Sequence, residues 1–213
     1  MKPENTLGPR VRNGTSQKKS SGYGRLYVIS APSGAGKSTI CKAMLERTPD
    51  LKYSVSYTTR SPRGEEENGV DYHFVSKADF LAGIQNGTWA EWAKVHGNYY
   101  GTSADFIDES LSRGSDVLLD IDVQGAKQIL KRYPDSVTIF IMPPSSAALK
   151  ARLLKRGSDS HVAIEQRLAN AEEEMTQRET YRHIIINDRL NEAIAAMAAI
   201  IDSARAEGGD ASS

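Results

Sequence analysis

Short apolar runs alternate with longer amphipathic stretches along most of this chain. Near-continuous apolar runs are typical of strands that are covered on both faces, as in a parallel sheet. Stretches whose apolar residues recur every three or four positions are typical of helices that pack on such a sheet. The alternation predicts an α/β fold in which a central, mainly parallel sheet is flanked by helices. Strands are expected at 26–29, 116–122, 137–142 and 184–186, and helices at 40–45, 104–113, 124–132, 146–155, around Arg167 and at 190–205.

The segment 54–102 breaks this alternation. A short β-like run at 54–57 is followed by a helix expected at 77–86, which has its apolar residues on one face, and by a strand expected at 88–95. We therefore expect a small α+β lobe inserted into the core. The expected divisions are a core at 25–53 and 103–206, an inserted lobe at 54–102 and a short lid at about 150–165.

The two ends of the chain differ from the rest in composition. Residues 1–24 contain basic side chains among Pro, Gly, Asn, Ser and Thr, with almost nothing apolar to bury, which predicts a flexible basic tail. A transit peptide would share this basic character, but Pro3, Gly8 and Pro9 disfavour the amphipathic helix that it needs. Residues 207–213 are expected to form a frayed C-terminal tail.

Charge and cysteine content restrict the possible partners. The chain has 27 basic and 27 acidic residues, so its net charge favours neither nucleic acid nor a membrane surface. No apolar run approaches the roughly 18 residues of a membrane-spanning helix. The single cysteine, Cys41, cannot form a disulfide within the chain. We expect a cytoplasmic protein, a monomer or small homo-oligomer, without nucleic-acid or membrane partners.

The stretch from Ser30 to Thr39, with the sequence SAPSGAGKST, joins an expected strand to an expected helix. Its small residues let successive backbone N–H groups point at a phosphate, and the helix N-terminus adds partial positive charge. In such a loop Lys37 reaches the outer phosphates and Ser38 is a ligand of Mg²⁺. Ala31 replaces the first glycine of the usual pattern but is still small. The expected contacts of this P-loop are Ser33, Gly34, Ala35, Gly36, Lys37, Ser38 and Thr39.

Two clusters in the inserted lobe suggest ligand contacts. Arg60 and Arg63 bracket a proline on a turn-rich segment, which suits a rigid pair of guanidinium groups around a phosphate. A solvated charged loop is the alternative. Glu91 lies between Trp89 and Trp92, and a carboxylate among aromatic side chains suits a planar base with ring N–H and amino donors. The alternative is an exposed glutamate on an ordinary strand.

Asp120 and Asp122 end one of the expected core strands. Ligands of parallel α/β sheets bind at the carboxyl ends of the strands, so both carboxylates should face the same crevice as the P-loop. The run from Asp122 to Gly125 also fits the Asp-x-x-Gly element of GTP-hydrolysing switches. The sequence contains no Asn-Lys-x-Asp base-reading motif, however, which disfavours a switch.

Three arginines flank the glycine-containing break between the expected helices of the lid. Arg152 and Arg156 lie one helical turn apart, and Arg167 lies on the following helix. Such arginines could close over a triphosphate. Surface ion pairs with the nearby glutamates are the alternative.

Five motifs, in their order and spacing, resemble those of the guanylate kinase family. They are Ser30–Ser38, Ser56–Arg63, Gly97–Thr102, Asp120–Gly125 and Ile186–Asp188. The resemblance covers roughly residues 25–205. Each motif is only modestly specific, but the ordered set is strongly so. The resemblance implies a P-loop core with an inserted GMP-binding lobe and a lid.

The resemblance also implies a role for each candidate residue. The GMP phosphate would be held by Arg60, Arg63, Tyr72 and Tyr100, and the guanine edge would be read by Ser56, Glu91, Thr102 and Asp122. The metal would be bound by Ser38 and by Asp120, directly or through water, with Asp120 also near the transferred phosphoryl group. The ATP phosphates would be approached by Lys37, Arg152, Arg156 and Arg167, and the adenine by Asn187. The residues implied in catalysis are Lys37, Arg60, Asp120, Arg152, Arg156 and Arg167.

The function implied is phosphoryl transfer from ATP to GMP, and to dGMP, with Mg²⁺, in purine nucleotide metabolism. A guanylate-kinase-like interaction module without catalysis is an alternative, but such a module would be expected to lack an intact P-loop. A related kinase acting on a phosphorylated sugar is another alternative, but it would not need the guanine-reading carboxylates.

Overall fold

The computed structural model describes residues 22–95, 97–155 and 161–209. Most of the predicted basic tail at 1–24, the predicted lid residue Arg156 and the end of the predicted C-terminal tail lie outside these ranges. No helix within them is both long enough and apolar enough to cross a membrane.

The central sheet consists, in spatial order, of β2 (Lys52–Tyr53), β7 (Val117–Asp120), β1 (Leu26–Ser30), β8 (Val137–Met142) and β9 (His183–Ile186). All four neighbouring pairs are parallel. β1 lies in the middle, where Val28 is in register with Leu119 on one side and with Thr138 on the other. The predicted parallel α/β sheet is thus confirmed, and the P-loop leaves from the carboxyl end of its central strand.

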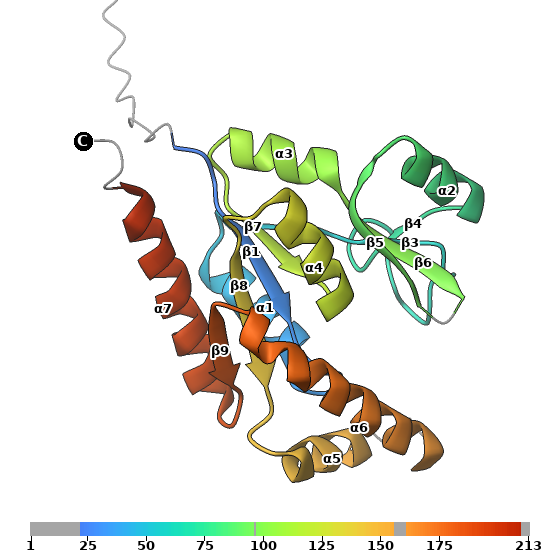
Figure 1. Ribbon diagram of the computed structural model, residues 1–213, viewed down its shortest axis with the longest axis vertical. Coiled ribbons are helices and arrows are strands. Elements are labelled where there is room, and N and C mark those ends of the chain that lie inside the picture. The colour runs from blue at the N-terminus through green and yellow to red at the C-terminus, as the bar shows by residue number, and fades with distance from the viewer. Residues whose placement is uncertain (1–21, 96, 156–160, 210–213) are drawn as a thin grey trace, which may run out of the picture.

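Helices cover both faces of this sheet (Figure 1), namely α1 (Lys37–Arg47) and α7 (Leu190–Gly209) on one side and α3 (Ala104–Ser112) and α4 (Val123–Arg132) on the other. Alternate residues of β1 enter the two layers. Tyr27 and Ile29 pack with apolar residues of α1 and α7, whereas Leu26 and Val28 pack with those of α3 and α4. A strand buried on both faces needs apolar residues at every position, which explains the unbroken apolar run.

A second, mixed sheet forms the inserted lobe and consists, in spatial order, of β4 (His73–Phe74), β3 (Tyr57–Thr58), β6 (Asn98–Ser103) and β5 (Trp89–Val95). Helix α2 (Lys77–Gln85) covers it, and the Ser76 hydroxyl caps this helix by accepting the Asp79 N–H. The lobe has its own small core, because the fully buried Phe80 ring stacks on Trp89 with a centroid distance of 4.5 Å. The predicted α+β lobe is present.

The helices α5 (Ser146–Lys155) and α6 (His161–Thr176) form a separate arm of the core (Figure 1). Their contact is a satellite cluster made by Leu149, Leu153, Ile164 and Ala171. A short 3₁₀ helix, η1 (Gln177–Thr180), connects α6 to β9.

Three predicted boundaries are corrected. The run 54–57 is not one strand: Ser54 still donates its N–H to Leu118 of the central sheet, whereas Tyr57 already pairs with the second sheet. The chain crosses between the two sheets in this interval. The strand predicted to end at Asp122 ends at Asp120, because the Asp122 carboxylate caps α4 instead. Helix α7 continues to Gly209, three residues into the predicted tail, because Ala206 and Glu207 favour helix.

The end of α7 is anchored to the start of the sheet by an ion pair. Arg205 Nε lies 2.7 Å from Asp116 Oδ2, and the other oxygen of Asp116 accepts the Arg25 N–H at 2.8 Å. The Asp116 side chain is only 11% exposed. We expect Arg205→Ala to lower the free energy of unfolding by about 1–3 kcal/mol, because it leaves a largely buried carboxylate with a weaker set of partners.

Urea denaturation measures this effect, and Arg189→Ala is the matched control. Arg189 pairs with Glu192, and both side chains are largely exposed at 76% and 67%, so this change should cost less than about 0.5 kcal/mol. Equal losses in the two variants would contradict the anchoring role of Arg205.

Candidate active site

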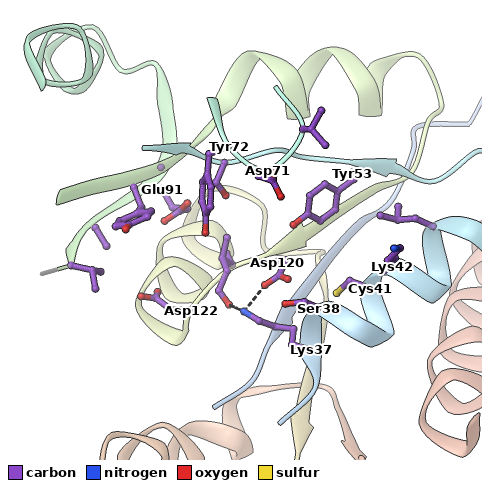
Figure 2. Close-up of a pocket in the computed structure, with 18 residues that line it drawn as sticks. Lys37, Ser38, Cys41, Lys42, Tyr53, Asp71, Tyr72, Glu91, Asp120 and Asp122 are labelled. Atoms are coloured by element: carbon purple, nitrogen blue, oxygen red, sulfur yellow. Dashed lines mark hydrogen bonds and ion pairs between the residues drawn. The ribbon is translucent and has the colours of Figure 1, made fainter. Parts of the chain in front are cut away.

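A cleft of about 870 Å³ opens between the carboxyl ends of the core strands and the inserted lobe. Figure 2 shows Lys37 and Ser38 of α1 on one side of this cleft and Tyr72 and Glu91 of the lobe on the other. Core and lobe therefore contribute to a single site. The predicted site residues that line it are Lys37, Ser38, Ser56, Tyr72, Glu91, Tyr100, Asp120 and Asp122.

The P-loop has the backbone geometry that its glycines allow. Gly34 and Gly36 have φ angles of 91° and 94°, in the left-handed region that disfavours other residues. Gly36 is the N-cap of α1, so Lys37, Ser38 and Thr39 form its first turn. The N–H groups of a first turn have no partner within the helix and attract anions. The loop predicted from the sequence is thus in a phosphate-binding context.

Two side chains hold the P-loop from behind through the carbonyl of Ala35. Asn187 Nδ2 donates to this oxygen at 2.7 Å, and Arg152 Nη1 donates to it at 3.5 Å. Arg152 also donates to the Asn187 carbonyl at 2.7 Å, and Asn187 is only 5% exposed. A side chain on Gly36 would lie 2.4 Å from Asn187 Nδ2, so the absence of a Cβ is needed here. Neither Arg152 nor Asn187 lines the large cleft, and both support the loop.

The Lys37 ammonium group is held in the cleft by two oxygen atoms (Figure 2). It forms an ion pair of 2.5 Å with Asp120 Oδ1 and donates a hydrogen bond of 3.2 Å to the Ile121 carbonyl. Asp120 is the last residue of β7, so the strand end predicted to face the P-loop does so. The Ser38 hydroxyl lines the same cleft.

Glu91 of β5 is buried in the wall of the cleft with an exposure of 6%. Its Oε1 accepts the Thr102 hydroxyl at 2.6 Å, which explains why Thr102 lies behind the cleft surface. Burial raises the pKa of Glu91 to about 7, and the Asp122 charge adds to this, whereas the Thr102 hydrogen bond lowers it. A Cβ on Gly125 would lie 2.7 Å from Glu91 Oε2, so a larger residue in the first turn of α4 would displace this carboxylate. Two carboxylates, Glu91 and Asp122, thus meet at the seam between lobe and core.

Of the two predicted phosphate-clamp arginines, Arg60 is buried and Arg63 is exposed. The Arg60 guanidinium lies 5.2 Å from the centroid of the Tyr72 ring. The Tyr72 and Tyr100 rings meet edge to face at 6.0 Å. A hydrogen bond to Glu66 is the main cause that raises the pKa of Arg60, and a weaker contribution comes from Tyr100. Arg60 therefore stays charged.

A smaller cavity of about 260 Å³ lies beside the P-loop against α6. Ser33, Arg167 and Glu174 are among the residues that line it. Burial raises the pKa of Glu174, while the Lys37 charge lowers it. The structure therefore brings Arg167 to the P-loop region, together with an acidic residue that was not predicted.

Some expectations about side chains differ from the structure. Trp89 and Trp92 do not line the cleft: the Trp89 indole donates to the Phe80 carbonyl at 3.1 Å, inside the lobe core. The aromatic side chains that line the large cleft are instead Tyr53, Tyr72 and Tyr100. Alternation along β5 places Trp92 on the opposite face from Glu91, and the register shift between Trp89 and Glu91 turns Trp89 away as well.

The arrangement suits two phosphorylated ligands. Cations stand at the P-loop and at Arg60, and Glu91 and Asp122 supply carboxylate oxygens that can accept hydrogen bonds. No histidine, cysteine or carboxylate cluster of three or more that could hold a metal alone occurs among the described residues.

Several known proteins are similar to this chain along most of its length. Residues 23–204 match the family model described as guanylate kinase. The guanylate kinase of Shewanella violacea is 50% identical over 183 residues, which cover 85% of this chain and 88% of the relative. That of Vibrio parahaemolyticus is 49% identical over 186 residues, covering 86% and 90%. The crystal structure of guanylate kinase from Anaplasma phagocytophilum is similar with a TM-score of 0.70 and 34% identity, covering 87% of each chain.

The raised pKa of Glu91 predicts a specific pH dependence of stability. The folded protein holds the Glu91 proton up to about pH 7, whereas the unfolded chain releases it near the ordinary value of 4.5. The free energy of unfolding should therefore fall between these pH values as the pH rises, by on the order of 3 kcal/mol from this group.

Denaturant unfolding of the ligand-free protein at a series of pH values, compared with Glu91→Gln, isolates this contribution. We expect the variant to lose less stability than the wild type as pH rises through this interval. A stability difference between the two proteins that stays constant with pH would rule out the raised pKa.

Proposed function

Because the chain belongs to the guanylate kinase family and catalyses the ATP-dependent phosphorylation of GMP, we propose that its P-loop holds ATP while its inserted lobe holds GMP. The observation that carries this division is the carboxylate pair Glu91 and Asp122, which shares one cleft with Lys37. A purine that offers both a ring N–H and an amino group needs two acceptors, and this pair supplies them.

On the donor side, the first turn of α1 and the Lys37 ammonium group bind the ATP phosphates. Lys37 is already oriented by Asp120 and by the Ile121 carbonyl, which lowers the cost of ordering it around a ligand. Arg167 approaches the same phosphates from α6, whereas Arg156, which the sequence predicts to do so too, lies outside the described residues. Arg152 acts in part by holding the Ala35 carbonyl of the P-loop.

On the acceptor side, Arg60, Arg63, Tyr72 and Tyr100 bind the GMP phosphate. Glu91 and Asp122 accept the guanine donors, with Thr102 orienting the Glu91 carboxylate and Ser56 lining the same wall. Since guanine N–H groups favour the ionised form of Glu91, GMP binding should lower its pKa. None of these contacts involves the ribose 2′-hydroxyl, so dGMP is a second substrate.

The reaction needs no strong base, because the nucleophile is an oxygen of the GMP phosphate. This oxygen attacks the γ-phosphorus of ATP, the bond from that phosphorus to the β,γ-bridging oxygen breaks, and ADP and GDP result. The protein holds the two anions in line and spreads positive charge over the transferred group through Lys37 and the arginines.

The cleft also suits Mg²⁺, which favours hydroxyl and carboxylate oxygens and retains several waters. Ser38 and Asp120 both line the cleft and would hold the ion, Asp120 directly or through water. When bound, Mg²⁺ neutralises charge on the ATP phosphates.

Neither alternative function is favoured. An interaction module would not need Lys37 and Ser38 beside an ordered Asp120, and a sugar-phosphate kinase would not need the buried Glu91. The product GDP places the enzyme in purine nucleotide metabolism. The buried free thiol of Cys41 supports a reducing, cytoplasmic location.

A coupled assay of ADP formation with GMP, dGMP, AMP, UMP, CMP and ribose bisphosphate tests this proposal. We expect kcat/KM for GMP to exceed that for AMP by at least about a thousandfold, because a site built for hydrogen-bond donors rejects a ligand that leaves its acceptors unpaired. Glu91→Gln should raise the KM for GMP far more than the KM for ATP. If AMP were as good a substrate as GMP, or if both KM values rose equally, the guanine assignment would be wrong.

A further inference from the structure

The carboxylate of Glu66 joins the two arginines of the proposed acceptor site. Arg60 Nη1 and Nη2 each donate to one of its oxygens at 2.8 Å, and the backbone N–H of Arg63 donates to Oε2, also at 2.8 Å. A guanidinium that is bound by both oxygens of a carboxylate has its plane fixed as well as its position.

The local backbone selects Glu66 from a run of three glutamates. Gly64 has a φ of 56°, in the left-handed region, and the Glu66 N–H donates to the Arg63 carbonyl at 3.1 Å. This turn brings Glu66 back to the arginines, whereas Glu65 and Glu67 are exposed.

Arg60 is confined on several sides. It is 9% exposed, its Nη1 also donates to the Ser61 carbonyl at 2.8 Å, and its guanidinium lies over the Tyr72 ring. The bonds to Glu66 and Ser61 use three of the five guanidinium N–H groups. The Nε–H and one Nη2–H are not used by these bonds and remain for Tyr100 and for a ligand.

From this geometry we propose that Glu66 is a positioning residue for the acceptor phosphate, which it orients through the Arg60 guanidinium without touching it, while its bond to the Arg63 N–H holds the turn that carries Arg63. The proposal rests on the proposed function, in which these arginines bind the phosphate of GMP. A positioning role and a competing role for Glu66 predict opposite changes in the KM for GMP. A carboxylate that merely competed with the phosphate for Arg60 would weaken GMP binding, so its removal would lower the KM for GMP. A positioning carboxylate strengthens binding, so its removal raises that KM.

The test compares Glu66→Gln with Glu65→Gln, which removes the same charge from an exposed position of the same loop. Steady-state kinetics give KM for GMP and ATP, and inhibition by guanosine reports base binding without a phosphate.

For Glu66→Gln we expect a KM for GMP raised by about tenfold or more, because charge-assisted hydrogen bonds are lost. The KM for ATP and the guanosine inhibition constant should stay within about twofold, as should all three values in Glu65→Gln. Glu66→Asp, which keeps the charge on a shorter side chain, should give an intermediate KM for GMP and carries the test if Glu66→Gln does not fold.

A lowered or unchanged KM for GMP in Glu66→Gln would overturn the proposal. So would a parallel loss of guanosine and GMP binding, which would indicate a role in folding the lobe. Arg60→Ala in the same assay distinguishes a failure of the proposed acceptor site from a failure of the positioning role of Glu66. If Arg60→Ala leaves the KM for GMP unchanged, the proposed acceptor site is wrong. If it raises this KM while Glu66→Gln does not, only the positioning role fails.

Discussion

Two phosphate-bearing molecules repel each other, and holding both in one cleft requires cations whose positions are fixed before the ligands arrive. The net charge of the chain is zero, so this task depends on individual groups. Lys37 is held by Asp120 and the Ile121 carbonyl, and Arg60 is held by Glu66 and the Tyr72 ring. Each cation keeps N–H donors free for a ligand, because ammonium and guanidinium groups have more donors than these partners use.

The seam between core and lobe places the two carboxylates that we propose as base readers. Glu91 comes from β5 of the lobe and packs against Gly125 of α4, while Gln128 of α4 binds both the N–H and the carbonyl of Trp92 at 3.2 and 2.9 Å. This side-chain amide pairs with β5 as a neighbouring strand would. The proposed guanine site therefore depends on the attachment of the lobe to α4, whereas the proposed ATP site depends on α1 and on the support of the P-loop by Asn187.

The parallel sheet, the P-loop and the acidic strand end could be predicted because their signals are local. An apolar run, a glycine pattern and a carboxylate next to a strand are each visible within a few residues. The support of Ala35 by Asn187 could not be predicted, because it joins positions 152 residues apart in sequence. The proposed role of Glu66 could not be predicted either, since only the backbone turn at Gly64 distinguishes Glu66 from Glu65 and Glu67. The capping of α4 by Asp122 depends on where β7 stops, and strand ends are poorly determined by propensity alone.

The most direct measurement is a crystal structure with a bisubstrate analogue in which adenosine and guanosine are joined through a phosphate chain. Glu91 and Asp122 should contact the guanine edge, Arg60 and Arg63 the phosphate next to guanosine, and Lys37 the phosphates next to adenosine. Binding in the opposite direction, with guanine beyond the P-loop, or a phosphate chain that does not reach the two arginines, would contradict the division of the cleft into a donor half and an acceptor half.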